Sequence, residues 1–158
     1  MSSNVRTVSV KVARLPGAKD LPLPAYKTAG AAGMDLYAAV PADEPVTLSP
    51  GARAAIPTGL QIAVPQGYEA QVRARSGLAK NHGIAMVNGP GTIDCDYRGE
   101  ICVIMINTDA AEPFRIQRGD RIAQMIVAPV AQVEWEEQAA LSDSETERGA
   151  GGFGSTGK

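Results

Sequence analysis

The chain has 158 residues, a formal net charge of −2 and a pI of about 5.4. This length predicts a single domain, and the weakly acidic charge argues against a protein that binds nucleic acid through a basic surface. No segment reaches the roughly 18 apolar residues of a membrane span, and the first residues, MSSNVRTVSVKV, lack the apolar run of a signal peptide. We therefore expect a cytoplasmic protein whose two cysteines stay reduced.

Glycine and proline are frequent and spread along the chain, with 17 and 11 residues. Because both disfavour helix interiors, they favour short strands joined by turns. In chain order, apolar patterns predict one strand in 7–14, one in 34–40, three in 46–68, and one each in 68–75, 84–87, 92–97 and 100–107, with two more in 114–135. One short helix is predicted from Ser76, its N-cap, to the residue before Gly83. The turn NGPG, residues 88–91, predicts a hairpin.

These elements predict an all-β fold, an antiparallel jelly roll or distorted β-barrel with one short helix. The run EICVIMIN, residues 100–107, is almost continuously apolar, as in a strand buried on both faces. Burial against other subunits would explain such a run in a small domain. From residue 136 onward the sequence is polar and glycine-rich. We therefore expect one β domain in residues 1–135 and a flexible C-terminal arm in residues 136–158.

Four stretches carry candidate chemistry. In GTIDCDYRGE, residues 91–100, strand alternation would direct Ile93, Cys95 and Tyr97 to one face and Asp94, Asp96 and Arg98 to the other. These carboxylates are candidates for a general base or a cation ligand, although a solvated edge strand explains them equally well.

In ARSGLA, residues 74–79, Ser76 at a helix start beside Arg75 would make a small anion site, but a capping serine with a surface arginine is the simpler interpretation. Asp35 in AGMDLYA alone indicates no more than a turn aspartate. His82, the single histidine, receives no role, and the composition excludes a zinc site and a Ser-His-Asp triad.

The segment RGAGGFGSTGK, residues 148–158, contains most of a P-loop, G-x-x-x-x-G-K. We do not assign a P-loop, because LSDSETERGA before it shows no strand pattern and no Ser or Thr follows Lys158. Its amide donors, hydroxyls and cation still suit an anion.

Five stretches occur in a fixed order between Ala32 and Gly157, namely AGxDL, RSGLA, NGPGTIDxDYRGE, RGDRIAQ and RGxGGFGSTG. Together they resemble the motifs of the trimeric dUTPases. The resemblance implies a jelly-roll homotrimer that hydrolyses dUTP to dUMP and pyrophosphate with Mg²⁺, in active sites that each combine motifs from three subunits.

The resemblance also implies roles for single residues. Asp94 matches the carboxylate that orients the attacking water, and Tyr97 matches the ring that packs under the deoxyribose and refuses a 2′-hydroxyl. Asn88 and the backbone near Gly91 match the turn that binds uracil. Asp35 matches an aspartate that acts near the metal through water.

Further residues match phosphate-binding positions of the family. Those in the second and fourth motifs are Arg75, Ser76, Gly77 and Gln124. In the arm, Arg148 would pair with the γ-phosphate and Phe153 would stack on uracil. The residues that would wrap the terminal phosphates are Gly154, Ser155 and Thr156.

One position departs from the family pattern, because many members have a second serine where this chain has Gly77. Gly77 keeps its N–H, so we expect phosphate binding to survive. Two alternatives stay open, a dCTP deaminase-like enzyme of the same superfamily and a non-catalytic trimeric β scaffold. The deaminase would lack a GGFGSTG tail, and the scaffold would have lost Asp94, Tyr97 or the tail.

Overall fold

The computed structural model describes residues 7–140, which form eleven strands and one short helix. The strands are β1 (Lys11–Arg14), β2 (Met34–Tyr37), β3 (Val46–Leu48), β4 (Arg53–Pro57), β5 (Leu60–Ala63), β6 (Tyr68–Arg73), β7 (Ile84–Met86), β8 (Gly91–Ile93), β9 (Cys102–Asn107), β10 (Phe114–Ile116) and β11 (Arg121–Pro129). The helix α1 spans Ser76–His82. The predicted all-β jelly-roll type of fold with one short helix is confirmed, although the described strands do not close a barrel.

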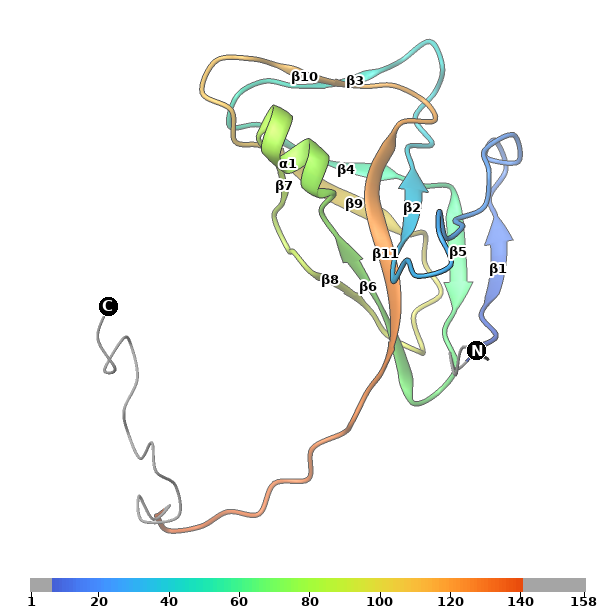
Figure 1. The fold of residues 1–158 in the computed structure, drawn as a ribbon, viewed down its shortest axis with the longest axis vertical. Coiled ribbons are helices and arrows are strands. Elements are labelled where there is room, and N and C mark those ends of the chain that lie inside the picture. Colours follow the sequence, from blue (N-terminus) through green and yellow to red (C-terminus); the bar gives the residue numbers. More distant parts are fainter. Residues whose placement is uncertain (1–6, 141–158) are drawn as a thin grey trace.

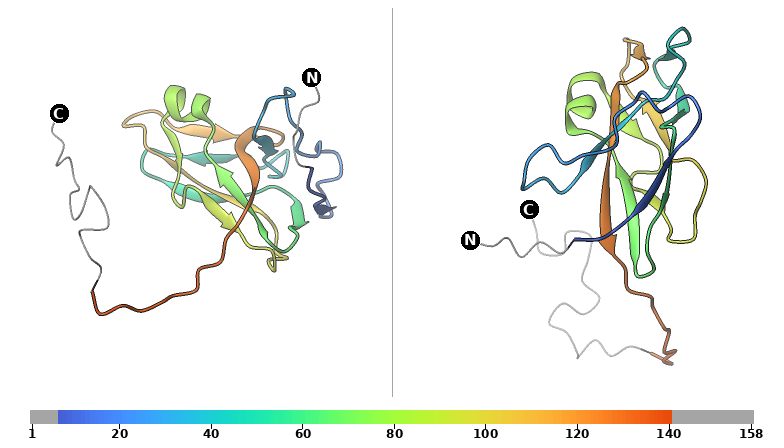
Figure 2. Two further views of the ribbon diagram at one scale, coloured as in Figure 1. Left: turned by 60° about the horizontal axis from the view of Figure 1, so that its bottom comes forward. Right: turned by 90° about the vertical axis from the view of Figure 1, so that its right-hand side faces the viewer.

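All strand pairings among the described residues are antiparallel. The largest sheet has the order β2-β11-β6-β8, and a second sheet has the order β4-β9-β7. The strands β1 and β5 form one pair, and β3 and β10 form another. Figure 1 shows β11 crossing the body beside β2, with α1 following β6 at one end of the large sheet. Figure 2 shows that residues 130–140 lead away from this body.

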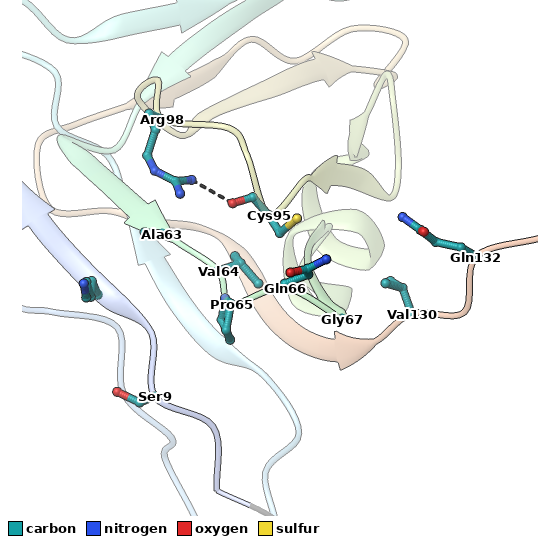
Figure 3. Close-up of a pocket in the computed structure, with 11 residues that line it drawn as sticks. Ser9, Ala63, Val64, Pro65, Gln66, Gly67, Cys95, Arg98, Val130 and Gln132 are labelled. Atoms are coloured by element: carbon teal, nitrogen blue, oxygen red, sulfur yellow. Dashed lines mark hydrogen bonds between the residues drawn. The ribbon is translucent and has the colours of Figure 1, made fainter.

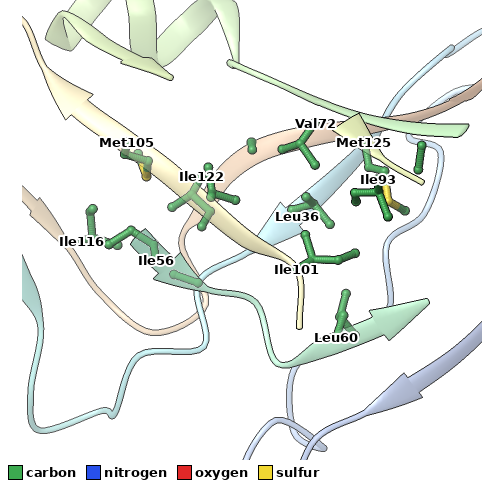
Figure 4. Packing of buried hydrophobic residues seen from close by; sticks show 14 of the residues in the cluster. Leu36, Ile56, Leu60, Val72, Ile93, Ile101, Met105, Ile116, Ile122 and Met125 are labelled. Atoms are coloured by element: carbon green, nitrogen blue, oxygen red, sulfur yellow. The ribbon is translucent and has the colours of Figure 1, made fainter. Parts of the chain in front are cut away.

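The hydrophobic core lies between the sheets and collects one face of nearly every strand. Val72, Ile93 and Met125 come from the large sheet, and Ile56 and Met105 come from the second sheet (Figure 4). Burial alternates along β6 and β9, as a period of two residues requires. The core therefore fixes which face of the large sheet is left for polar side chains.

Within the single chain, the strand β9 is buried on one face only. Its burial alternates, with Val103 and Met105 buried, while Ile104 and Ile106 are only partly covered. The single chain thus leaves an apolar strip on the outer face of the β4-β9-β7 sheet.

The NGPG turn does not form the predicted hairpin. The strand β7 before it pairs with β9, whereas β8 after it pairs with β6. The turn therefore transfers the chain from the second sheet to the large sheet. Local turn chemistry predicts a change of direction but not which strands become neighbours.

Two further predictions need correction. The strand predicted over residues 7–14 is reduced to β1, and all four of its residues are exposed. The N-cap of α1 is Arg75 with extended backbone, so Ser76 is the first helical residue and does not cap the helix. The predicted C-terminal end is confirmed, because Gly83 adopts the left-handed conformation with φ of 61°.

Candidate active site

Asp35, Arg75 and Gln124, from the first, second and fourth motifs, meet at one end of the large sheet. Asp35 on β2 lies opposite Gln124 on β11, and Gln124 lies opposite Arg73 on β6. Paired residues of antiparallel strands point to the same face, so these side chains share the face away from the core. The Gln124 side-chain amide also donates to the carbonyl of Ala74, 3.2 Å away.

Two arginines hold the Asp35 carboxylate. Arg75 Nε lies 3.2 Å from Asp35 Oδ1, and Arg121 Nη1 lies 3.2 Å from Oδ2. Arg75 Nη1 also donates to the carbonyl of Arg121 at 2.9 Å. The Asp35 side chain is only 13% exposed, against 48% for Arg121. We call these four residues, Asp35, Arg75, Arg121 and Gln124, the Asp35 cluster. It contains one carboxylate and two guanidinium groups, so it has a net positive charge that suits an anion.

A glycine makes room for this cluster. A Cβ atom at Gly33 would lie 2.7 Å from Oε1 of Gln124, closer than side chains approach one another. The glycine of the AGxDL motif is therefore explained by the packing of the Gln124 side chain.

Ser76 and Gly77 form the start of α1 beside the Asp35 cluster. Both residues are exposed, and no side chain caps the first turn. The amides of a first helical turn have no intrahelical acceptor, so they can donate to a ligand. This is the place where the sequence predicted an anion site.

Asp94 and Tyr97 lie in a turn and not in the strand predicted over residues 91–100. The strand β8 ends at Ile93, and the Tyr97 N–H donates to the Asp94 carbonyl at 3.2 Å. We call residues 94–100 the third-motif turn. Both side chains are exposed there, with 44% of Tyr97 accessible. The turn thus presents Asp94 and the Tyr97 ring outward together.

The Tyr97 ring is fixed by its neighbours in the turn. Its hydroxyl donates to the carbonyl of Glu100 at 3.0 Å. A Cβ atom at Gly99 would lie 2.3 Å from this hydroxyl oxygen and 2.5 Å from Cζ. Only glycine at position 99 therefore allows the observed ring position.

Two side chains of the turn itself hold it in shape. Arg98 Nη1 donates to the carbonyls of Cys95 and Tyr97 at 2.8 and 2.7 Å, and Figure 3 shows the first of these bonds. The Glu100 carboxylate accepts the Gly59 N–H at 2.7 Å. The turn is thereby tied to the loop between β4 and β5.

The third-motif turn and the Asp35 cluster lie at opposite ends of one sheet. Ile93, the residue before the third-motif turn, pairs with Ala70 on β6, so the turn begins beside Glu69. Gln124 of the Asp35 cluster pairs with Arg73, at the other end of β6. Glu69 and Arg73 are four residues apart on β6, or about 13 Å at the rise of a strand. A single chain therefore does not bring Asp94 beside Arg75.

Asn88 and Gly91, the predicted uracil site, lie at the crossing between the sheets. Asn88 is exposed, and its side-chain nitrogen would lie 3.1 Å from a Cβ atom at Gly91. Gly91 itself is buried in β8 opposite Val72. The predicted arm residues are outside the described part of the chain: Arg148, Phe153, Gly154, Ser155 and Thr156.

A pocket of about 900 Å³ lies elsewhere, between β1, the β5–β6 turn and the third-motif turn. Figure 3 shows Ser9, Gln66, Cys95, Arg98 and Gln132 around it. None of the residues of the Asp35 cluster lines this pocket. Asp94 and Tyr97 do not line it either, so the candidate catalytic and phosphate-binding side chains lie outside this pocket.

Within residues 7–140, no three His, Cys, Asp or Glu side chains are grouped so that they could hold a metal ion. In the same range no helix is long and apolar enough to cross a membrane.

Sequence reasoning missed Arg121, Gly99 and Glu100. Arg121 lies in the RGDRIAQ motif, and the other two lie in DYRGE. The only sequence signal for these three residues was that they lie inside motifs already selected as candidate sites. Their contacts, however, depend on a strand register and on a ring position that no sequence pattern specifies.

The structure is an antiparallel β protein with a positively charged cluster at one end of its large sheet. A family model described as dUTPase matches residues 19–157. The chain therefore belongs to the dUTPase family, and it is a dUTP diphosphatase that hydrolyses dUTP to dUMP and pyrophosphate.

Solved structures support this assignment. The dUTPase of Staphylococcus bacteriophage 80alpha with dUpNHpp is 26% identical and has a TM-score of 0.83, with 96% of this chain and 100% of that chain covered. The dUTPase of phage phi11 of S. aureus, 22% identical over 84% of this chain and 97% of that chain, has a TM-score of 0.72 and shows the fold alone. A mutant of the phi11 enzyme has been described with a structural Mg(II) ion.

Proposed function

We propose that this dUTPase is a homotrimer with shared active sites, in which the third-motif turn of one subunit faces the Asp35 cluster of another. The observation that carries this proposal is the separation of the two groups at opposite ends of the β2-β11-β6-β8 sheet. A reaction that needs both groups on one substrate requires a second copy, and closed symmetric assembly supplies one.

The outer face of the β4-β9-β7 sheet supports the trimer. Ile104 and Ile106 on β9 are partly covered, and Val87, after β7, is 53% exposed. The Cys102 thiol lies on the same face of β9, and burial together with Glu100 raises its pKa, so that it stays protonated at neutral pH. We expect this apolar strip to be buried between subunits, and sedimentation at micromolar concentration to give the trimer mass.

The catalytic group in this proposal is Asp94. Its carboxylate would accept a proton from a water molecule while the water oxygen attacks the α-phosphorus of dUTP. The bond from the α-phosphorus to the bridging oxygen breaks, and pyrophosphate leaves with dUMP as the other product. Support comes from the exposed position of Asp94 beside Tyr97 in the third-motif turn.

Tyr97, Asn88 and Gly91 select the nucleoside in this proposal. The Tyr97 ring would pack under the deoxyribose, where a 2′-hydroxyl would collide with it. The Tyr97 hydroxyl already donates to the Glu100 carbonyl, which leaves the ring as the selecting group. Asn88 and the backbone of Gly91 would hydrogen-bond uracil.

The triphosphate would bind at the Asp35 cluster and the start of α1. Arg75 pairs with Asp35 through Nε and donates to the carbonyl of Arg121 through Nη1. Neither contact uses its Nη2 group, which would donate to a phosphate oxygen in this proposal. Ser76 and Gly77 would add the amides of the first helical turn. Gln124 would lie near the phosphates and the attacking water.

Mg²⁺ is the cofactor we assign to this reaction. The described residues offer one aspartate at the cluster and no group of three ligands, which fits Mg²⁺ held mainly by substrate phosphates with several waters kept. Asp35 would contact such an ion through water. When bound, the ion neutralises charge on the phosphate oxygens.

The arm would complete the site. We propose that residues 1–135 form the β domain and residues 136–158 the arm, in which Arg148 pairs with the γ-phosphate and Phe153 stacks on uracil. Gly154, Ser155 and Thr156 would wrap the terminal phosphates. In support, all residues of 130–140 are exposed and outside any helix or strand, with Trp135 at 89% exposure.

We place the enzyme in the cytoplasm, because Cys95 and Cys102 are free thiols, as in a reducing compartment.

Neither the deaminase-like alternative nor the non-catalytic scaffold is favoured by the dUTPase match over residues 19–157.

A substrate panel tests this function. Pyrophosphate release is measured with dUTP, UTP, dTTP and dCTP, with and without Mg²⁺. We expect release from dUTP with Mg²⁺ and little from the others. Ammonia release from dCTP would favour the deaminase, and no turnover of any nucleotide would favour the scaffold.

A further inference from the structure

The strand β11 contains a β-bulge next to the Asp35 cluster. Opposite β2, Gln124 pairs with Asp35 and Ala123 with Leu36, but Tyr37 then pairs with Arg121, so that Ile122 is an extra residue. Ile122 and Ala123 are both buried. In a regular strand that is covered on one face, neighbouring residues alternate, so only one of the two would be buried. Figure 4 shows Ile122 among the core side chains.

The bulge decides where the Arg121 side chain points. In a regular strand, residues three apart point to opposite faces, so Arg121 would face away from Gln124. With one residue inserted, Arg121 lies on the same face as Gln124 and Asp35. Its Nη1 group then reaches Asp35 Oδ2 at 3.2 Å.

Arg121 also acts on Arg75. Its carbonyl oxygen accepts Arg75 Nη1 at 2.9 Å, and its guanidinium holds the Asp35 oxygen that Arg75 does not contact. Without Arg121, both carboxylate oxygens would be available for a two-point pair with Arg75. Such a pair would engage the Nη2 group of Arg75 with Asp35 and leave it unable to donate to a phosphate oxygen.

We propose that Arg121 is a positioning residue that holds Asp35 and thereby directs Arg75 toward the triphosphate. The proposal rests on the role of Arg75 in phosphate binding proposed above. It assigns Arg121 no contact with the substrate, so its effect passes through Asp35.

The test is a double-mutant cycle. Two quantities are measured for wild type, Arg121→Gln, Asp35→Asn and the double variant. The first is the affinity for dUpNHpp with Mg²⁺, and the second is the inhibition constant of 2′-deoxyuridine, which has no phosphate. Glutamine removes the charge but keeps the backbone carbonyl. We expect Arg121→Gln to weaken dUpNHpp binding about tenfold, with deoxyuridine binding unchanged and Arg121→Lys partly restoring the affinity.

In the Asp35→Asn background, the same Arg121→Gln change should have little further effect, because coupled residues are not additive. An undiminished effect in that background would overturn the proposal and make Arg121 a direct phosphate ligand. Unchanged dUpNHpp affinity in Arg121→Gln, or an equal loss for deoxyuridine, would overturn it as well.

Two controls separate this inference from the proposed function. Arg115→Gln makes the same chemical change at an exposed position on β10 and should leave both affinities unchanged. Arg75→Gln should weaken dUpNHpp binding by more than Arg121→Gln does. Normal dUpNHpp binding by Arg75→Gln would overturn the phosphate role itself, whatever Arg121→Gln shows.

Discussion

The position of the Tyr97 ring depends on the missing side chain of Gly99. The ring hydroxyl lies too close to the position of a Cβ atom on residue 99 for any residue but glycine, and it donates to the carbonyl of Glu100. The observed position of the Tyr97 side chain therefore requires glycine at position 99. The same relation joins Gly33 to Gln124.

We predict that Tyr97→Phe keeps the preference for dUTP over UTP and that Tyr97→Ala loses much of it. The reason is that the bulk of the ring, and not its hydroxyl, would exclude the 2′-hydroxyl of a ribonucleotide. The ratio of kcat/KM values for the two nucleotides measures this preference. Equal relaxation in the two variants would show that the hydroxyl selects the sugar.

We predict that Asp94→Asn lowers kcat by about a hundredfold or more and leaves dUpNHpp binding largely intact. The amide keeps the shape of the carboxylate but cannot accept the proton of water. Single-turnover rates and analogue affinities check this prediction. A kcat near the wild-type value would remove Asp94 from the role of base.

At the scale of elements, the sequence predicted most strands of the body, because proline and glycine turns delimit short alternating segments. It predicted neither the partners of β7 and β8 nor the bulge at Ile122. Strand pairing depends on contacts that are distant in sequence, and a bulge changes the register without changing the strand pattern. The Asp35 cluster was therefore predicted as separate motifs, and the contribution of Arg121 was not predicted.

Asn107 joins two strands and a loop at one end of the second sheet. This fully buried side chain donates to the carbonyls of Leu48 and Glu112 at 2.9 and 2.8 Å and accepts the N–H of Asp109 at 2.9 Å. It thus links β9 to β3 and to the loop before β10.

We predict that Asn107→Ala lowers the free energy of unfolding by about 3 kcal/mol, because buried backbone groups lose their partners. Urea unfolding at a fixed protein concentration measures this loss. Asn81→Ala on the exposed face of α1 is the matched control and should change stability little. A loss as small as that of the control would show that water or a shifted loop replaces the bonds.

At the scale of the whole molecule, the proposed roles require more than one chain. The motifs identify the family, but they do not by themselves tell which chain supplies which residue. That information comes from the strand register, which places Asp94 and Arg75 at opposite ends of β6.

Deleting residues 149–158 should leave a folded trimer, because that segment is glycine-rich and polar and offers little apolar surface to a core. We expect kcat/KM for dUTP to fall steeply, and Phe153→Ala to give a milder loss. A Trp at position 153 should change its fluorescence on addition of dUpNHpp with Mg²⁺ and much less on addition of dUMP. Full activity of the deletion variant would contradict a role for the arm.

The most direct test of shared sites is complementation between Asp94→Asn and Arg75→Gln, each of which we expect to be almost inactive as a homotrimer. The two variants are mixed at equal amounts, unfolded and refolded together, and dUTP turnover is measured. If one site takes Asp94 and Arg75 from different subunits, about a quarter of the sites in randomly mixed trimers carry both wild-type residues, and about that share of activity returns. If both residues of a site come from one chain, the mixture stays as inactive as the separate variants, and the account of shared sites is wrong.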